Sequence, residues 1–247
     1  MERQRVSGTP VIWREGEEAP FCPGCHDGTI GRLMLEAIDE MGIRNNTVCI
    51  SGVTCAGFLS LGMEMDSVIC VAHGRAPDVA TGLKRALFYK PVVFTIQGDG
   101  DTIAIGAGSL VNAAMRAENI TVCMVNNTVY GTTGGQMAPT SLTGQVTTTT
   151  PTGRERLNGL PARVPEMLAT LDGVAYAARG AVNTAANYQK TKKFFKQALT
   201  RQMEGAGMTF VEFLSACPPN WKLNPMESLK RIEEEMIPAY PIGEFKV

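Results

Sequence analysis

Apolar and polar positions along this chain form blocks that predict strands alternating with helices. Short runs rich in Val, Ile and Phe predict buried strands, and apolar residues spaced three and four apart predict helices. The predicted strands cover residues 47–53, 67–72, 91–97, 120–125, 173–178 and 208–214. The predicted helices cover residues 28–41, 77–88, 102–117, 164–171 and 188–204. This order predicts an α/β fold with a mostly parallel sheet and helices on both faces.

Helix ends carry recognisable signals. Asp27 is placed to cap the helix at 28–41, and Gly42 is placed to end it. Asn224 and Glu227 have the spacing of a capping box, with Asn224 as the N-cap. Between the strand at 120–125 and the helix at 164–171, residues 128–154 are rich in Thr and Gly and almost free of charge. A loop of this length predicts either a lid over a ligand or a disordered connection.

Composition and charge exclude several classes of protein. The 247 residues suffice for one large α/β domain, and the net charge of −1, without a basic run, gives no case for nucleic acid or anionic membranes. No apolar stretch approaches the ~20 residues that a membrane span needs. Residues 1–13 lack the apolar core of a signal peptide. We therefore expect a cytoplasmic protein without a nucleic-acid or membrane partner.

The seven cysteines fall into two groups by their neighbours. Three lie in apolar runs and are expected in the core: Cys49, Cys70 and Cys123. Four lie in loop sequences (FCPGCHDG, GVTCAG and SACPPNW): Cys22, Cys25, Cys55 and Cys217. Two of these form C-x-x-C, which predicts a thiolate metal site. Disulfides are disfavoured in a reducing cytosol.

Polar residues follow two of the predicted strands. Gly98-Asp99-Gly100 follows the strand at 91–97, and Asn126-Asn127 follows the strand at 120–125. If these strands are parallel neighbours, Asp99 and Asn127 emerge at the edge where open α/β sheets bind ligands. Their oxygens, with a free backbone carbonyl, suit Mg²⁺ shared with phosphate, and the glycines let a diphosphate approach the backbone. The alternative is a pair of ordinary turns.

Several motifs together resemble the β subunit of 2-oxoacid:ferredoxin oxidoreductases, in particular the 2-oxoglutarate and branched-chain enzymes of anaerobes. They are C-P-G-C, H-G-R-A-P followed by A-T-G, G-D-G-D, N-N-x-x-Y-G with T-G-G-Q, S-A-C-P-P-N-W and P-I-G-E-F-K. G-D-G with N-N alone marks any thiamine diphosphate enzyme. The resemblance runs from about Trp13 to Lys246. It implies a thiamine diphosphate-binding fold: a single domain over residues 1–247, with an N-terminal cysteine loop and a C-terminal tail completing an iron–sulfur site.

The resemblance implies thiamine diphosphate bound through Mg²⁺, with Asp99 and Asn127 as side-chain ligands and the Val129 carbonyl as backbone ligand. The other implied cofactor-binding positions are His73, Gly74, Gly98, Gly100, Asp101, Asn126, Thr132, Gly134 and Gln136. It also implies a [4Fe-4S] cluster on Cys22, Cys25, Cys55 and Cys217. Cysteines on separate loops can converge on a cluster. Structural zinc is the alternative, although Cys55 and Cys217 lack the second C-x-x-C of a usual Cys₄ zinc site.

Three further positions carry specific expectations. In the family, the segment that His73 opens lies beside the thiazolium, so His73 is a candidate catalytic residue that orients the substrate carboxylate or moves protons. The alternative is a loop histidine that caps a helix. Tyr130 is expected to pack. His26-Asp27 follow C-x-x-C where family members often carry Gly, and a nearby histidine could tune or join a cluster.

The implied reaction is oxidative decarboxylation of a 2-oxoacid to acyl-CoA and CO₂, with electrons passing through the cluster to ferredoxin. No convincing activating Glu is found in this sequence, and the resemblance assigns it to a partner α subunit, with ferredoxin-like and γ subunits as further partners. Two alternatives stay open. They are a non-oxidative thiamine diphosphate-dependent decarboxylase subunit and an iron–sulfur electron-transfer subunit without thiamine chemistry. The sequence does not identify the 2-oxoacid or the coenzyme A contacts.

Overall fold

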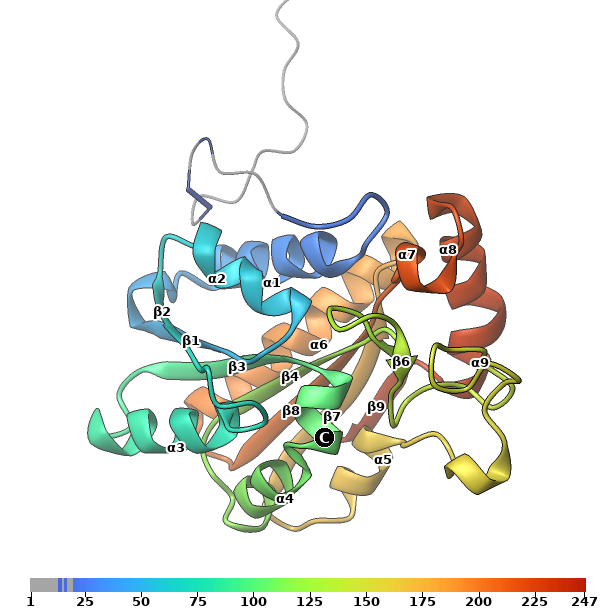
Figure 1. Cartoon of the computed structure of the whole chain (residues 1–247). Helices are drawn as coiled ribbons and strands as arrows, with labels where there is room; N and C mark the ends of the chain where they lie inside the picture. Colours follow the sequence, from blue (N-terminus) through green and yellow to red (C-terminus); the bar gives the residue numbers. More distant parts are fainter. Residues whose placement is uncertain (1–12, 15, 17–19) are drawn as a thin grey trace, which may run out of the picture.

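A computed structural model describes residues 13–14, 16 and 20–247. The prediction about a signal peptide concerns residues 1–13, of which only Trp13 is among the described residues. Among the described residues, one sheet has the strand order β2-β1-β3-β4-β8-β7-β9 (Figure 1). Its strands are β1 (Thr47–Ser51), β2 (Asp66–Ile69), β3 (Val92–Gly98), β4 (Thr121–Asn126), β7 (Val174–Ala181), β8 (Met208–Leu214) and β9 (Gly243–Lys246). All neighbours pair in parallel except β9, which runs antiparallel to β7. The predicted mostly parallel sheet is confirmed, and β9 is an addition that the sequence pattern did not predict.

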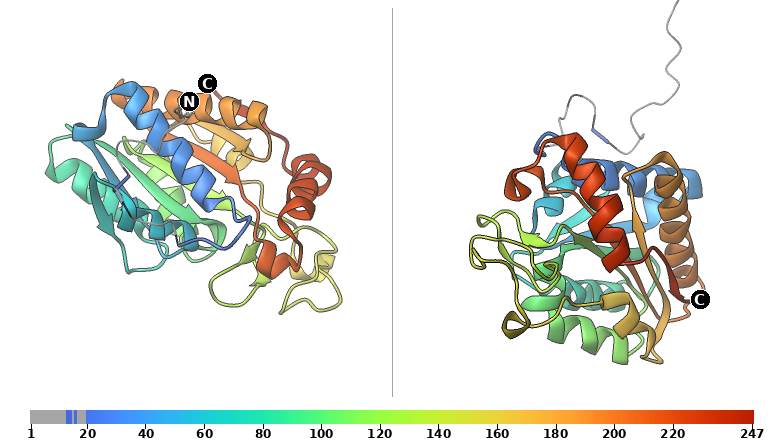
Figure 2. Two further views of the ribbon diagram at one scale, coloured as in Figure 1. Left: turned by 90° about the horizontal axis from the view of Figure 1, so that it is seen from above. Right: turned by 90° about the vertical axis from the view of Figure 1, so that its right-hand side faces the viewer.

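Helices cover both faces of the sheet, as predicted (Figures 1 and 2). On one face, α1 (Asp27–Met41) and α6 (Ala185–Met203) pack together over the first core cluster. On the other, α3 (Ala76–Ala86), α4 (Ala107–Met115) and α5 (Val164–Ala169) cover the second cluster. The shorter elements are η1 (Arg44–Asn46), η2 (Cys55–Phe58), α2 (Leu59–Gly62), η3 (Gly100–Ala104), β5 (Val129–Tyr130), β6 (Gln136–Met137), η4 (Arg156–Asn158), α7 (Pro218–Trp221), α8 (Pro225–Arg231), η5 (Ile232–Met236) and α9 (Ile237–Ala239).

Aromatic packing fixes α6 on the sheet. The ring of Phe195 in α6 meets Phe94 of β3 edge to face, with centroids 5.9 Å apart, and Phe213 of β8 at 6.2 Å. All three side chains are fully buried. Such pairs stabilise by about 0.5–1.5 kcal/mol beyond their buried area. The cluster therefore holds β3 and β8 in place on either side of β4, whose carboxyl end carries Asn126 and Asn127.

The predicted helix cap at Asp27 is wrong. The first helical residue of α1 is Asp27 itself, and its N-cap is His26. The buried carboxylate of Asp27 accepts a hydrogen bond of 2.8 Å from Ser215 Oγ, so it faces the end of β8 instead of the free N–H groups of the helix. Gly42 ends α1 with a φ of 66°, and the Asn224–Glu227 capping box is present, both as predicted.

The predicted single crossover helix at 102–117 is divided in two. Residues 100–104 form the π-helix η3, and α4 begins only at Ala107. Gly106 separates them because a Cβ at this position would lie 2.1 Å from the carbonyl oxygen of Asp101. Single-turn π-helices occur frequently at functional sites. Here the π-helix begins directly after Asp99, which is its N-cap.

The loop at 128–154 is folded around one buried arginine. Arg154 donates hydrogen bonds to the carbonyl oxygens of Ala138, Pro139 and Ser141, at 3.2, 2.9 and 2.5 Å. The antiparallel pair of β5 and β6 opens the segment, and a bridge between Thr147 and Thr150 lies near its end. Of the two predictions, the disordered connection is therefore wrong.

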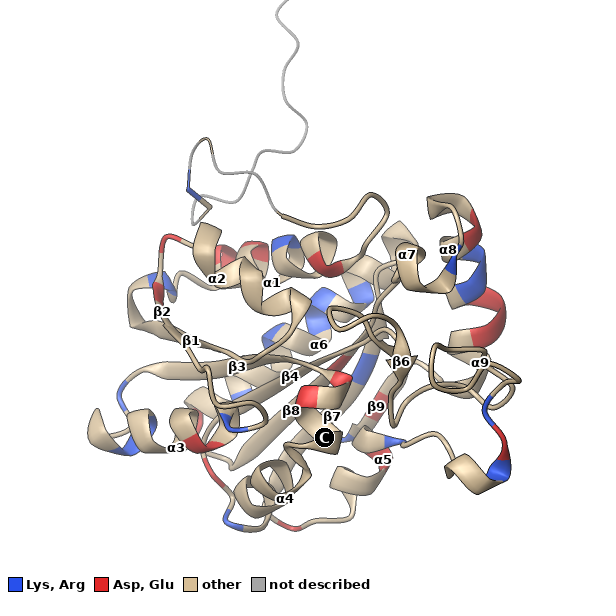
Figure 3. Cartoon of the chain, in the orientation of Figure 1, with Lys and Arg blue, Asp and Glu red and all other residues tan. Residues whose placement is uncertain are grey.

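Residues of both charges lie on several helices (Figure 3), and some of them form ion pairs. Lys192 and Lys196 of α6 contact Glu40 of α1 at 2.7 and 3.0 Å. Exposed pairs of this kind contribute at most about 1 kcal/mol each. Among the described residues, no helix combines the length and the apolar character of a membrane span.

Candidate active site

The parallel pairing of β3 with β4 brings Asp99 and Asn127 to one edge of the sheet. Both residues line a pocket of about 250 Å³ at the carboxyl ends of these strands. The pocket is lined by eight of the residues predicted to bind the cofactor: His73, Gly98, Asp99, Gly100, Asp101, Asn127, Val129 and Thr132. Four other predicted residues do not line it: Gly74, Asn126, Gly134 and Gln136. The structure thus brings together predicted residues that follow β3 and β4 with His73 and Thr132 from neighbouring loops.

Asp99 is a buried carboxylate surrounded by neutral donors. Its Oδ1 accepts the Gly100 N–H at 2.7 Å, and its Oδ2 accepts the hydroxyl of Thr140. Burial raises the pKa of Asp99 to about 7, and these hydrogen bonds oppose the shift only in part. A divalent cation in the adjoining pocket would supply positive charge that these neutral partners do not, so Asp99 fits the role of a Mg²⁺ ligand.

The two glycines beside Asp99 are required by neighbouring protein atoms. A Cβ on Gly100 would lie 2.3 Å from Cε1 of Tyr130, and one on Gly98 would lie 2.7 Å from Oγ1 of Thr54. The ring of Tyr130 therefore packs on the backbone of Gly100, in agreement with its predicted packing role. Both glycines form part of the pocket wall.

The turn that carries Asn127 has an unusual backbone. Thr128 has a φ of 62°, a left-handed conformation that β-branched residues rarely adopt. The Asn127 Oδ1 accepts the Val129 N–H at 3.1 Å, and Trp221 Nε1 donates to the Asn127 carbonyl at 3.0 Å. Asn126 points away from the pocket, because its Nδ2 donates to Glu212 Oε1 at 2.6 Å. Asn126 therefore lies beneath the turn and does not line the pocket, and its cofactor-binding role stays a prediction.

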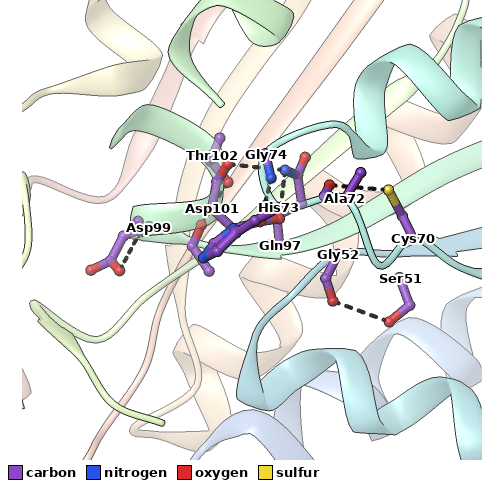
Figure 4. A network of polar contacts seen from close by, with 12 residues as sticks. Ser51, Gly52, Cys70, Ala72, His73, Gly74, Gln97, Asp99, Asp101 and Thr102 are labelled. Atoms are coloured by element: carbon purple, nitrogen blue, oxygen red, sulfur yellow. Dashed lines mark hydrogen bonds and ion pairs between the residues drawn. The ribbon is translucent and has the colours of Figure 1, made fainter. Parts of the chain in front are cut away.

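His73 lies on the other side of the end of β3 from Asp99 (Figure 4). Its Nδ1 contacts Oδ1 of Asp101, which also accepts the Gly74 N–H at 2.7 Å. Oδ2 of Asp101 accepts Gln97 Nε2 at 2.8 Å. The His73 side chain is 45% exposed and lines the pocket. The alternative role as a helix cap is wrong, because the N-cap of α3 is Arg75.

The T-G-G-Q stretch folds into a tight turn beside the pocket. Gln136 Oε1 accepts the hydroxyl of Thr133 at 2.7 Å, and its Nε2 donates to the Thr133 carbonyl at 2.9 Å. Gly134 has a φ of 120°, which only glycine adopts readily. Gln136 and Gly134 therefore shape the loop, and Thr132 is the member of the predicted set that reaches the pocket.

Three of the four loop cysteines lie near Asp27: Cys25, Cys55 and Cys217. Burial is the first cause of the raised pKa of Cys25, Cys55 and Cys217, and the charge of Asp27 raises all three further. The charge of Cys22 raises the pKa of Cys55, that of Cys55 raises the pKa of Cys217, and that of Cys217 raises the pKa of Cys25. The four thiols are therefore close enough to interact electrostatically. Within the described residues, no three His, Cys, Asp or Glu side chains are arranged to hold a single metal ion. The three cysteines predicted in the core are buried: Cys49, Cys70 and Cys123.

Two of the four loop cysteines, Cys55 and Cys217, lie at or beside the pocket. Cys55 lines it, and its Sγ lies 2.8 Å from the hydroxyl of Thr132. Asn220 donates to Cys217 Sγ at 3.2 Å and to the Gly131 carbonyl at 3.0 Å. The loop cysteines and the sheet edge that carries Asp99 and Asn127 therefore belong to one continuous region.

His26, the departure noted after C-x-x-C, is buried beside Cys25. Its Nδ1 has no hydrogen-bond partner among the described residues, and burial lowers the pKa of His26 to about 4. A neutral imidazole with an unpartnered nitrogen next to thiols keeps open a ligand role for His26.

Residues that the sequence analysis missed lie beneath the pocket. Thr140 contacts Asp99, and Glu212 of β8 contacts both Asn126 and Arg179 of β7. A charged residue within each of two otherwise apolar strands is the signal that could have revealed the pair. Thr140 lies in the Thr-rich loop and has no such signal.

Comparison with known proteins agrees with this geometry. Residues 50–213 match the family described as thiamine pyrophosphate enzyme, C-terminal TPP-binding domain. The chain is 43% identical over 241 residues to ketoisovalerate oxidoreductase subunit VorA of Methanothermobacter marburgensis, covering 96% of this chain and 50% of the relative. It is 33% identical over 233 residues to 2-oxoglutarate synthase subunit KorB of Archaeoglobus fulgidus, covering 93% and 78%. The chain thus spans about half the length of VorA.

A solved structure is also similar. It is the 2-oxoglutarate:ferredoxin oxidoreductase of Magnetococcus marinus with 2-oxoglutarate, coenzyme A and succinyl-CoA bound. The TM-score is 0.75 at 28% sequence identity, covering 88% of this chain and 70% of that chain.

Proposed function

The chain belongs to the thiamine pyrophosphate enzymes, in the family that includes the KorB subunits of 2-oxoglutarate synthases, and we propose that it is the thiamine-binding subunit of a 2-oxoacid:ferredoxin oxidoreductase. The proposed reaction converts a 2-oxoacid, either 2-oxoglutarate or a branched-chain one, to acyl-CoA and CO₂ and passes electrons to ferredoxin. One observation carries the oxidative form of this proposal. Cys55 lines the same pocket as Asp99 and Asn127, so a thiol-bound electron acceptor would adjoin the reacting centre.

The residues at the pocket edge would hold the cofactor. Asp99, the Asn127 amide oxygen and the Val129 carbonyl would bind Mg²⁺, which in turn would bind the diphosphate. When bound, thiamine diphosphate supplies a nucleophilic carbon and an electron sink for decarboxylation. The Trp221 hydrogen bond to the Asn127 carbonyl holds the backbone of this turn. The protein thus provides a rigid set of oxygen atoms before any ligand arrives.

His73 is proposed to act on the substrate. Its Nδ1 lies against Asp101, which fixes the ring and leaves Nε2 free to face the pocket. When protonated, His73 can donate Nε2–H to the carboxylate of a 2-oxoacid. After loss of that proton, Nε2 can accept one. Asp101 is therefore a positioning residue for His73.

The four loop cysteines would hold a [4Fe-4S] cluster, which accepts single electrons. Their sulfurs would each bind a different iron, which requires a wider spacing than one zinc ion does. We also propose that residues 1–247 act as one domain in which the N-terminal cysteine loop and the C-terminal tail complete this site. Among the described residues, no glutamate lines the pocket, so the carboxylate that activates thiamine is proposed to come from a partner α subunit. Ferredoxin-like and γ subunits, ferredoxin and coenzyme A complete the proposed partners.

The test uses the native complex purified without oxygen. It should be brown, contain iron and sulfide, and reduce a viologen dye only with a 2-oxoacid and coenzyme A. A panel of 2-oxoglutarate, 2-oxoisovalerate and pyruvate identifies the substrate. Asp99→Ala should lose both thiamine diphosphate and turnover, whereas Asp66→Ala, at an exposed position, should keep both.

Two results would contradict the proposal. Iron-free protein that still decarboxylates a 2-oxoacid would indicate a non-oxidative thiamine enzyme. Unchanged electron transfer by Asp99→Ala, from protein that never contained thiamine, would indicate an electron carrier.

A further inference from the structure

A fully buried ion pair lies beneath the proposed metal site. Arg179 of β7 and Glu212 of β8 are register partners, and Nε lies 2.7 Å from Oε2. Both side chains are 0% exposed. Burying two ions costs several kcal/mol each, and well-packed apolar residues of similar size are often as stable or more so. Stability alone therefore does not explain this pair.

Glu212 sets the orientation of Asn126. A carboxylate only accepts, so the 2.6 Å contact from Asn126 Nδ2 turns the amide oxygen towards the Thr128 N–H, 3.0 Å away. Thr128 is the left-handed residue of the turn, and its own hydroxyl is buried without a hydrogen-bond partner in the part of the chain that the structure describes. Such a conformation is strained in a β-branched residue and persists only where the surroundings enforce it. The Asn126 amide is one of the groups that enforce it.

Arg179 reaches the other half of the site. Its guanidinium lies 5.2 Å from the ring centre of Tyr240, and the Tyr240 hydroxyl donates to the Thr140 carbonyl at 2.5 Å. The hydroxyl of Thr140 in turn donates to Asp99. The outer face of Arg179 pairs with Glu166 at 2.7 Å, which leaves its Nε directed at Glu212. One arginine thus connects to Asp99 through Tyr240 and Thr140, and to the turn that carries Asn127 through Glu212 and Asn126.

We propose that the Arg179–Glu212 pair is a positioning element for the metal site, in which Glu212 fixes Asn126 and Asn126 holds the strained turn bearing Asn127 and Val129. The chemical class of the ligand, a divalent cation with a diphosphate, comes from the proposed function. The role assigned to the pair is the new element. Neither residue lines the pocket.

The variant Glu212→Gln tests the role with almost no change of shape. Glu212 accepts from two donors, Arg179 Nε and Asn126 Nδ2, and an amide has only one oxygen to offer them. The oxygen is expected to face the charged guanidinium of Arg179, because hydrogen bonds from a charged donor are the stronger ones. The new NH₂ group then faces Asn126 Nδ2, so the Asn126 amide must turn over and its own NH₂ group meets the Thr128 N–H. We expect the apparent dissociation constant of the complete complex for Mg²⁺ with thiamine diphosphate to rise about tenfold or more. Calorimetry and the fluorescence of Trp221, which contacts Asn127, measure it.

A second variant restores the hydrogen bonds with their polarity reversed. In Asn126→Asp/Glu212→Gln, the amide introduced at position 212 donates to the carboxylate introduced at position 126, while the amide oxygen accepts from Arg179. The second oxygen of that carboxylate accepts the Thr128 N–H. This double variant should bind the cofactor within about threefold of the wild type, and it decides the question if the single variant does not fold. Glu118→Gln is the matched control, because Glu118 is 4% exposed and pairs with Arg85 and Arg116 away from the pocket.

The outcomes separate cleanly. The role is supported if Glu212→Gln binds weakly while the double variant and Glu118→Gln bind normally. It is overturned if Glu212→Gln binds as the wild type does, if the double variant is no better than the single one, or if Glu118→Gln is equally impaired. A wild-type complex without affinity for Mg²⁺ and thiamine diphosphate would refute the proposed function itself, and this role with it.

Discussion

Asp101 offers the sharpest test of how the pocket is built. Its carboxylate accepts from three groups: His73 Nδ1, the Gly74 N–H at 2.7 Å and Gln97 Nε2 at 2.8 Å. It joins the loop after β2 to the end of β3 (Figure 4). Asp101→Asn keeps the shape of the side chain and removes one acceptor and the charge. This substitution therefore changes the hydrogen bonds and leaves the packing almost intact.

The expected cost follows from the lost partners. The new NH₂ group faces either Gln97 or the donors of the His73 loop, so at least one buried donor is unpaired, at about 1–3 kcal/mol. The remaining bonds lose charge assistance, which roughly halves their strength. Together we expect the free energy of unfolding to fall by about 2–5 kcal/mol. Because His73 is no longer held, kcat of the assembled enzyme should fall more than KM changes.

Urea unfolding followed by circular dichroism measures the free energy of unfolding. Asp66→Asn makes the same chemical change at an exposed position and should stay within about 0.5 kcal/mol of the wild type. Gly52→Ala approaches Asp101 from the opposite side, since its Cβ would lie 2.1 Å from Oδ2, and it should reproduce the loss. If Asp101→Asn unfolded at the wild-type midpoint, the interpretation of Asp101 as the buried acceptor of this loop would be refuted.

Three further substitutions test separate parts of the description. Gly100→Ala places a methyl group 2.3 Å from the Tyr130 ring, so the ring must move; a loss of about 1–3 kcal/mol in thermal unfolding is expected, and an unchanged Tm would contradict the packing. Burial lowers the pKa of Lys84 from 10.5 to about 8, so the unfolded chain binds more protons between these values. As pH rises through that window, the free energy of unfolding of the wild type should therefore increase by about 1–3 kcal/mol relative to that of Lys84→Met. Urea midpoints measure this difference, and a difference that does not change with pH would contradict the lowered pKa. Asn224→Ala removes the capping box with Glu227 and should cost about 1 kcal/mol, whereas a neutral result would show that α8 is held by packing alone.

The sequence was sufficient where one local pattern determined one feature. Asp99 and Asn127 meet because consecutive strands joined by a right-handed crossover become parallel neighbours, and this follows from the order of the blocks. The break at Gly106 was not predictable, because it depends on contact between backbone atoms and not on apolar spacing. The strand β9 was missed because four residues at a chain end carry almost no periodicity, and its pairing with β7 is a tertiary event.

The candidate site shows the same division. Residues at strand ends were identified by their position, but the contact of Asn126 with Glu212 was not predictable, since Glu212 lies 86 positions away in the sequence. Asp27 was assigned as a cap for the same reason: its partner, Ser215, comes from the far end of the chain. Long-range polar partners leave no trace in a local window, and they decide where buried polar side chains point.

The four loop cysteines come from widely separated parts of the polypeptide: the segment before α1, the start of η2 and the residue before α7. An iron–sulfur cluster bound there would cross-link segments that span most of the chain. Cross-links that close long loops reduce the conformational entropy of the unfolded chain most strongly. Destruction of such a cluster by oxygen would release all three segments together. Resistance to heat and proteases would then depend on the redox history of the sample, and preparations exposed to air would unfold earlier than those kept anaerobic.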